Sequence, residues 1–319
     1  MSRRARRRSA PLRVAVLSGG VGGARFVRGL VEVLGGGAVD VVGNVGDDVE
    51  VLGLHISPDL DSILYALAGL ADEQRGWGRA EESWRALETV RELGGEAWFA
   101  LGDLDLGLHL VRTQAMRAGE PLSVVTARLA AALGVEARLL PATDDRLRTW
   151  IDSPAGTFPF QEWFVARGHR DDVDAVHYAG AADARPAPGA IEAIDAADVI
   201  VITPSNPYVS IGPILAVDEI RAAVERRRVP CVAVSPLIGG RAVKGPADRM
   251  LARLAGGTGP AEVAGCYPGL VDALVFDEQD APAELPDGVR PISTRTLMVD
   301  DDARRRLALA VLDAAASLA

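Results

Sequence analysis

Short apolar runs that end in turn-forming residues recur along the chain. Four such runs are RVAVLSGG (13–20), VDVVGNVGDD (39–48), DVIVITPSNP (198–207) and PCVAVSPLIGG (230–240). Short runs rich in valine and isoleucine and closed by Gly, Asn, Ser or Pro predict buried strands. The segments ARFVRGLVEVLG (24–35) and IGPILAVDEIRAAVERRR (211–228) have apolar residues at helical spacing and predict helices. This alternation indicates an α/β fold with a Rossmann-like parallel sheet, which binds its ligands beyond the carboxyl ends of the strands.

Other segments predict additions to this sheet. Residues 61–134 are mostly helical in pattern and predict a helical insertion, or lid, over the sheet. The aromatic, alternating segment 146–180 predicts a β-hairpin region packed on the core, and residues 301–319 predict an amphipathic C-terminal helix. We therefore expect a disordered basic tail over residues 1–11, followed by a single domain over 12–319.

Composition narrows the class of protein. The chain has 319 residues and a net charge of −10, which argues against a general binder of nucleic acid or of anionic membranes. Its two cysteines, Cys231 and Cys266, fit neither a disulfide framework nor a zinc site, so we expect a reducing, cytoplasmic environment. The apolar stretch after the arginine-rich start is too short for a signal or membrane-spanning segment. That start is either a solvated tail or an arm for nucleic acid or targeting.

The first strand runs into a glycine-rich stretch that contains Gly19, Gly20, Gly22 and Gly23. A helix N-terminus with exposed amides binds anions, and glycines let a phosphate approach the backbone. The dinucleotide fingerprint is only partly met, because the second strand ends in Asn44 instead of an acid for the ribose. The Walker pattern is also absent. A phosphate loop of neither standard kind is one interpretation, and a purely structural tight turn is the other.

Acidic residues follow the second strand. Asp47, Asp48, Asp59 and Asp61 lie on two loops and would supply oxygen ligands for Mg²⁺ beside a phosphate site. Alternatively, Asp59 or Asp61 caps the helix that begins near Ser62. Two nearby histidines, His55 and His109, are candidates for substrate contact or for structural roles.

Three residues that are rare in this chain fall at predicted strand ends. Lys244 is its only lysine, and Asn44 and Asn206 are its only asparagines. An amide suits a purine edge or a sugar, and a lysine suits a phosphate. We therefore expect a nucleotide site formed by the glycine loop, Asn44, Ser205, Asn206, Ser235, Gly239, Gly240 and Lys244. Simple structural turns are the alternative for each of these segments.

Several motifs, taken in order, strongly resemble one family. They are SGGVGGAR, NVGDD, HISPDLDSILYAL, LGDLDLGLHLVRT, LLPATDD, FQEWFV, PSNPYVSIGPILAV and VSPLIGGRAVKGPA, and they run from about residue 13 to 300. The chain is similar to the 2-phospholactate transferase family of coenzyme F420 biosynthesis, which includes members that use phosphoenolpyruvate. Where members often read Leu-Gly-Asp-Arg-Asp, this chain has Leu104 at the Arg position, so any contact from that Arg is missing.

The resemblance implies a homodimeric, Mg²⁺-dependent transferase with two substrates. These are a guanosine diphospho-acid donor, lactyl or enolpyruvyl, and the deazaflavin alcohol Fo, whose hydroxyl attacks the phosphorus that bears the acid so that GMP leaves. We expect Asp61, with Asp47 or Asp48, around the metal and the attacking hydroxyl, and Asp59, Asp61 and His55 around Fo. A nucleotide-sugar-binding regulatory protein of the gluconeogenesis-factor type is the alternative from another class. A nicotinamide oxidoreductase is less consistent with the missing ribose acid.

Overall fold

The computed structural model describes residues 12–280 and 284–318. The arginine-rich segment predicted to be a disordered tail, residues 1–11, lies outside the described residues. Among the described residues, no helix is long and apolar enough to cross a membrane.

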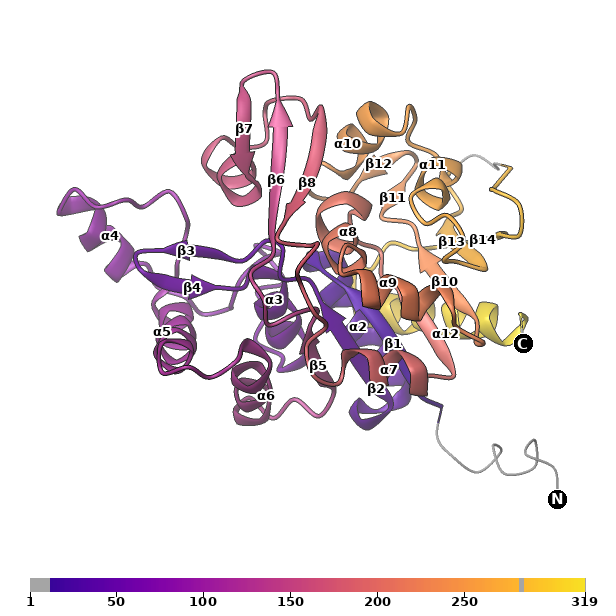
Figure 1. Ribbon diagram of the computed structural model, residues 1–319, viewed down its shortest axis with the longest axis horizontal. Coiled ribbons are helices and arrows are strands. Elements are labelled where there is room, and N and C mark those ends of the chain that lie inside the picture. Colours follow the sequence, from indigo (N-terminus) through magenta and orange to yellow (C-terminus); the bar gives the residue numbers. More distant parts are fainter. Residues whose placement is uncertain (1–11, 281–283, 319) are drawn as a thin grey trace.

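A seven-stranded parallel sheet forms the centre of the fold (Figure 1). Its strand order is β14-β13-β10-β9-β1-β2-β5. The chain thus builds outward from β1 in one direction and then restarts beside β1 with β9, which is the doubly wound Rossmann arrangement. The four strands predicted from the apolar runs are confirmed as β1, β2, β9 and β10, and three strands join them. The bounds are β1 Val14–Ser18, β2 Val39–Gly43, β5 Arg138–Pro141, β9 Val199–Ile202, β10 Cys231–Val234, β13 Ala273–Asp277 and β14 Arg290–Thr294.

Helices cover both faces of this sheet (Figure 1). On one face, α2 packs against α3 and α12. On the other face lie α7, α8 and α9. The bounds are α2 Gly20–Leu34, α3 Pro58–Leu67, α6 Leu122–Ala132, α7 Ala190–Ala196, α8 Gly212–Leu215, α9 Asp218–Glu225, α10 Ala247–Leu254, α11 Pro260–Gly265 and α12 Asp301–Ala316. Three shorter elements are the 3₁₀ helix η2 Gly36–Ala38 and the π-helices η3 Glu162–Ala166 and η4 Pro207–Ile211.

The single helix predicted over residues 211–228 is divided in two. The chain leaves the helical conformation at Val217, whose φ of −77° and ψ of 103° are extended, and α9 restarts at Asp218. Val217 is fully buried, so packing of its side chain in the core decides the break. Apolar residues recur across both short helices at the spacing expected of one continuous helix, so the sequence pattern does not reveal the interruption.

The predicted helical segment 61–134 contains four helices, with α4 Arg85–Glu92 and α5 Asp103–Arg117 between α3 and α6. The first of them, α3, belongs to the layer beside α2, whereas α5 packs against a small hairpin. This hairpin consists of β3 Val49–Val51 and β4 Leu54–Ile56, and with α4 and α5 it lies at the left of Figure 1. Along the chain, the hairpin separates Asp47 and Asp48 from Asp59 and Asp61.

The segment predicted as a β-hairpin region is a three-stranded antiparallel sheet of order β7-β6-β8, with bounds β6 Arg148–Ser153, β7 Gly156–Pro159 and β8 Ala175–Ala179. It projects from the main sheet (Figure 1) and has its own apolar cluster, which includes Phe160 and Trp163 and is shared with Val209 and Met250. A further two-stranded hairpin joins β11 Leu237–Ile238 and β12 Arg241–Ala242.

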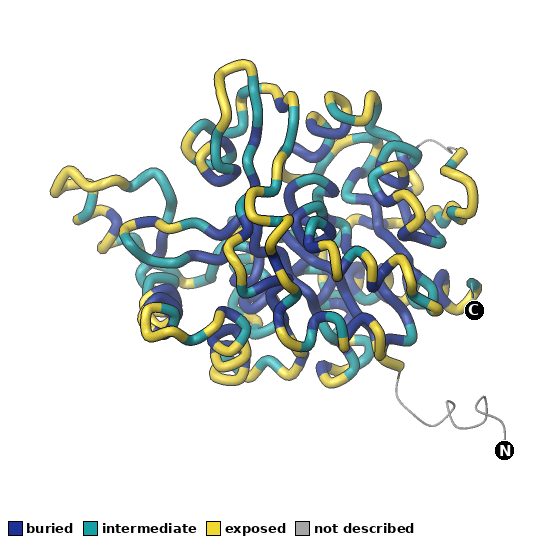
Figure 2. Tube along the Cα trace, viewed as in Figure 1, coloured by how far each residue is buried: buried dark blue, intermediate teal, exposed yellow. Residues whose placement is uncertain are grey.

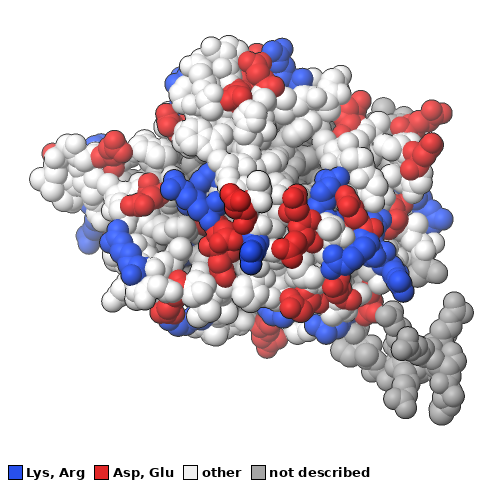
Figure 3. All heavy atoms as spheres, in the orientation of Figure 1, with Lys and Arg blue, Asp and Glu red and all other residues white. Residues whose placement is uncertain are grey.

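Burial follows this arrangement, because the inner strands of the central sheet are almost entirely buried, whereas exposed positions lie on the edge strand β14, on loops and on outer helix faces (Figure 2). The face drawn in Figure 3 carries acidic and basic side chains side by side.

Candidate active site

One cavity of about 580 Å³ lies at the carboxyl ends of the central strands. The loops after β1 and β9 both border it. Between these two strands the chain changes direction along the sheet, which is where doubly wound folds bind their ligands. Of the residues predicted for the site, ten line the cavity: Gly19, Gly20, Gly22, Asp47, Asp59, Asp61, Ser205, Asn206, Ser235 and Lys244. The other six lie behind its wall or away from it: Gly23, Asn44, Asp48, His55, Gly239 and Gly240.

The glycine loop serves the packing of the protein as well as the cavity. A Cβ on Gly22 would stand 2.7 Å from the carbonyl oxygen of Pro204, and one on Gly23 would stand 2.6 Å from the hydroxyl of Ser205. These two glycines therefore let α2 approach the loop after β9. Gly20, at a φ of +68°, donates its backbone N–H to the carboxylate of Asp59. These contacts support the interpretation as a structural turn, and the anionic group that Gly20 contacts is the protein's own Asp59.

Asn44 has a different role from the expected nucleotide contact. Its amide nitrogen donates to Asp59 Oδ2 at 2.8 Å and to the carbonyl of Val209 at 3.0 Å, and its oxygen accepts the backbone N–H of Gly46 at 2.7 Å. The side chain is fully buried. Because protein groups occupy its polar atoms, Asn44 positions Asp59 and does not face a ligand.

Asp47 and Asp59 are two carboxyl groups at the cavity wall whose ionised forms are disfavoured by burial. Burial, together with the charge of Asp59, raises the pKa of Asp47 well above its usual value. Burial raises the pKa of Asp59 to about 6, although hydrogen bonds from Asn44 and Gly20 oppose this shift. Asp47 Oδ1 is buried and has no hydrogen-bond partner among the described residues. Two such carboxylates suit a hard cation. A cation bound there would give Asp47 Oδ1 a partner and would reduce the repulsion between Asp47 and Asp59.

No group of three or more His, Cys, Asp or Glu side chains within residues 12–280 and 284–318 is arranged to hold a metal. Mg²⁺ does not require one, because it is commonly bound through one or two carboxylates plus water and substrate phosphates. The residues present therefore fit Mg²⁺ as a partner of a phosphate-bearing substrate.

The other two predicted acidic ligands are already paired. Asp61 forms two hydrogen bonds with the buried guanidinium of Arg112, one of them at 2.9 Å between Nη1 and Oδ2. Asp48 Oδ2 accepts hydrogen bonds from Ser57 at 2.9 Å and lies 2.8 Å from His55 Nε2, so Asp48 and His55 tie the β3–β4 hairpin together. Neither Asp59 nor Asp61 is the helix cap considered above, since the N-cap residue of α3 is Ser57.

A buried polar network that the sequence analysis missed continues from Asp61. Burial lowers the pKa of Arg112, but pairing with Asp61 outweighs it and leaves that pKa raised. The hydroxyl of Tyr65 donates to Asp105, and His109 lies between the two acids, 3.5 Å from Asp105 Oδ1 and 3.8 Å from Asp61 Oδ2. Burial tends to raise the pKa of Asp105, yet hydrogen bonds with His109 and Tyr65 hold it below its usual value. The only sequence signal was the spacing of His109 and Arg112, which places both on one helix face.

The LGDLD motif has a structural role at the start of α5. Asp103 accepts hydrogen bonds from Ser83 at 2.5 Å and from the backbone of Ala86 at 3.1 Å, which joins α5 to α4. Leu104, at the position where the family often has Arg, is 41% exposed and lies outside the cavity wall. Its side chain therefore supplies nothing to the cavity in this structure.

On the opposite side, the loops after β9 and β10 form the wall. Asn206 Oδ1 accepts the N–H of Tyr208 at 2.9 Å and so caps η4, and Ser205 donates to the carbonyl of Gly19 at 2.6 Å. Gly239 and Gly240 form the turn between β11 and β12, at φ values of +57° and +71°. Phe160, Phe164 and His169 form a parallel stack, with ring centroids 5.3 and 4.9 Å apart, that borders the cavity.

Comparisons with known proteins match nearly the whole chain. Residues 14–316 match the family described as 2-phospho-L-lactate transferase CofD. The chain is 43% identical over 313 residues to the phosphoenolpyruvate transferase of Streptomyces griseus subsp. griseus, covering 95% of this chain and 98% of that protein. It is 40% identical over 333 residues to the phosphoenolpyruvate transferase of Mycobacterium tuberculosis, covering 97% and 100%.

Solved structures show the same architecture. A protein from Bacillus halodurans aligns with a TM-score of 0.63 at 20% identity, covering 95% of this chain and 100% of that one. A second structure from that organism, a member of the UPF0052 family, aligns with a TM-score of 0.62 at 19% identity, covering 95% and 99%. At these identities the likeness concerns the fold alone.

Proposed function

Because the chain belongs to the 2-phospho-L-lactate transferase CofD family, and is therefore a transferase of coenzyme F420 biosynthesis, we propose that it transfers an enolpyruvyl phosphate group from a guanosine diphospho-acid donor to Fo and releases GMP. The names of its relatives favour the enolpyruvyl group over the 2-phospholactyl group. One observation carries the proposal: the glycine loop, the carboxylates and the loops after β9 and β10 all border the same cavity.

The cavity offers different chemistry to each part of the substrates. The start of α2 would bind the diphosphate through backbone amides of its first turn other than that of Gly20, which donates to Asp59. Ser205, Asn206 and Ser235 lie where the guanosine would extend along the loops after β9 and β10. The aromatic side chains of Trp77 and Phe99 also line the cavity and suit the flat ring of Fo.

We assign the metal to Asp47 and Asp59 instead of the set Asp47, Asp48 and Asp61 expected from the sequence. Asp61 is tied to Arg112. Asp48 is tied to His55 and Ser57 through Oδ2, and it does not line the cavity, although its Oδ1 has no partner among the described residues. Asp47 and Asp59 do line the cavity, and Asp47 Oδ1 also has no partner among the described residues. When bound there, Mg²⁺ would neutralise charge on the phosphates and draw electron density from the reacting phosphorus.

The reaction requires one new bond and one broken bond. The ribityl hydroxyl of Fo attacks the phosphorus that bears the acid, the bond from this phosphorus to the oxygen of GMP breaks, and the hydroxyl proton is lost. Asp61 can accept the hydrogen bond of that hydroxyl, because each carboxylate oxygen accepts two and Arg112 uses one on each. We assign to Asp61 the orientation of the hydroxyl and the acceptance of its proton.

The proposal is tested by incubating the protein with Fo, Mg²⁺ and an equal mixture of the enolpyruvyl and lactyl donors. Mass spectrometry should detect the Fo phosphodiester that carries the enolpyruvyl group in excess, together with an equal amount of GMP. A lactyl product in excess would correct the identity of the acid. Absence of both products, with GDP still bound, would support the regulatory nucleotide-binding protein.

A further inference from the structure

Only two of the described arginine and lysine residues line the cavity. These are Arg25, on the second turn of α2, and Lys244, after β12, and four aspartates, Asp47, Asp59, Asp61 and Asp105, line the same cavity. Lys244 Nζ donates to the carbonyl of Arg75 at 3.0 Å, and no described carboxylate lies within ion-pair distance of it. Among the Arg, Lys, Asp and Glu side chains of its lining, the cavity thus has four acidic and two basic groups.

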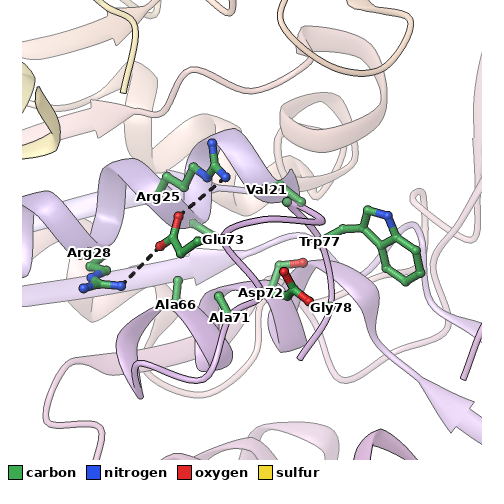
Figure 4. Close-up of a pocket in the computed structure, with 12 residues that line it drawn as sticks. Val21, Arg25, Arg28, Ala66, Ala71, Asp72, Glu73, Trp77 and Gly78 are labelled. Carbon is green, nitrogen blue, oxygen red and sulfur yellow. Dashed lines mark hydrogen bonds and ion pairs between the residues drawn. The ribbon is translucent and has the colours of Figure 1, made fainter. Parts of the chain in front are cut away.

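The two cations meet at one loop, residues 72–78, after α3. Arg25 Nη2 is 3.6 Å from Glu73 Oε2. A Cβ on Gly76 would collide with Lys244 Nζ and stand 3.6 Å from Arg25 Nη2, so both cationic groups lie beneath this glycine. Figure 4 shows Glu73 between Arg25 and Arg28, with the ring of Trp77 directed away from this cluster.

A donor of the proposed kind carries three anionic groups, namely two phosphates and one carboxylate. The amides of α2 and the cation held by Asp47 and Asp59 account for the diphosphate. The carboxylate is repelled by the aspartates of the lining, and Arg112, which is bound to Asp61, does not line the cavity. Arg25 and Lys244 are the cationic side chains that remain for it.

We propose that Arg25 and Lys244 together bind the carboxylate of the acid on the donor, beneath the loop 72–78. This inference rests on the proposed function. The guanidinium of Arg25 can form two parallel hydrogen bonds with a carboxylate, and the ammonium group of Lys244 attracts it as a point charge. Donors whose substituent has no carboxylate, such as guanosine diphosphate sugars, lose both contacts, so the pair selects an acid.

The experiment compares two ligands that differ by the acid alone. Calorimetry without Fo measures the Kd of enolpyruvyl-diphosphoguanosine and of GDP for the wild type, Arg25→Gln and Lys244→Met. Each substitution should raise the donor Kd by roughly 10- to 100-fold, as expected for a lost charged hydrogen bond. The GDP Kd should stay within about twofold, and Lys244→Arg should retain most of the donor affinity.

Arg28→Gln is the matched control. Arg28 lies one turn further along α2 and also pairs with Glu73, at 3.4 Å, but it does not line the large cavity. The Arg28→Gln variant should bind both ligands as the wild type does. If Arg25→Gln does not fold, Arg25→Lys provides a second variant that retains the charge.

Three results would overturn the proposal. One is an equal loss of GDP and donor affinity, which would place the cations at the diphosphate. Another is an unchanged donor Kd, and the third is an effect of Arg28→Gln equal to that of Arg25→Gln. Failure of the proposed function is a separate result, because it appears as absence of transfer to Fo by the wild type.

Discussion

The guanidinium of Arg112 and the carboxylate of Asp61 form a hydrogen-bonded ion pair inside the protein, although 51 positions separate them in sequence. Arg112 is fully buried, so its charge depends on this partner. The pair therefore connects the stability of the fold with the cavity that Asp61 lines.

Asp61→Asn should accordingly affect stability and chemistry together. Removing one member of a buried ion pair costs about 3–5 kcal/mol of unfolding free energy, because the other charge stays buried without compensation. Urea unfolding measures this loss, and product formation should fall by roughly 100-fold or more if Asp61 accepts the proton. The double variant Asp61→Asn/Arg112→Met should recover stability but no turnover. Recovery of turnover in the double variant would exclude a chemical role for Asp61.

An exposed pair provides the control for this experiment. Arg226 and Asp195 lie 3.0 Å apart with half of each side chain exposed. Asp195→Asn should change the unfolding free energy by less than about 1 kcal/mol, because water screens such pairs.

Asp47→Asn should separate metal binding from folding. Its carboxylate is buried beside other acids, so the neutral amide is expected to leave the stability of the metal-free protein unchanged or higher. Mg²⁺-dependent turnover should fall by roughly 100-fold if Asp47 is a ligand. Calorimetric titration of Mg²⁺ in the presence of GDP gives a second readout. Normal Mg²⁺ affinity in this variant would remove Asp47 from the metal site.

The stability of the metal-free protein should depend on pH through Asp59. Burial raises its pKa from 3.8 to about 6, so the folded state holds the proton more tightly than the unfolded state. The contribution of Asp59 is therefore fully present below about pH 4 and is lost as the pH rises to about 6, with a change of about 2–3 kcal/mol. Unfolding in EDTA from pH 4 to 7 should show this fall in the wild type relative to Asp59→Asn. Parallel curves for the two proteins would contradict the assignment.

Gly22→Ala should disturb the contact between α2 and the loop after β9. The new Cβ would stand 2.7 Å from the carbonyl of Pro204, and overpacking of this kind typically costs about 1–3 kcal/mol. Thermal unfolding and GDP affinity should both weaken. Gly37→Ala is the matched control, because nothing lies within 4 Å of its Cβ position. Equal effects of the two substitutions would show that this contact is unimportant.

The sequence by itself determined four of the seven strands of the sheet and the edge of the sheet at which the cavity lies. Strands buried on both faces need continuous apolar runs, so VAVLS and VIVI could be recognised without any partner strand. Polar and glycine residues at the ends of such runs predict where a ligand binds, and Gly20, Asp47, Asn206 and Lys244 do line one cavity. These are local signals, because each depends on residues adjacent in the chain.

Only the tertiary structure decided which of the four aspartates have partners. Asp61 is paired by an arginine from α5, Asp48 by a histidine across a hairpin, and Asp59 by the rare Asn44. Likewise, Lys244 meets a carbonyl 169 positions away. Such contacts depend on how helices and loops pack in three dimensions, and the residue types alone are equally compatible with metal ligation, capping or ion pairing. The partners, and hence the free carboxylates, follow from packing between segments distant in sequence.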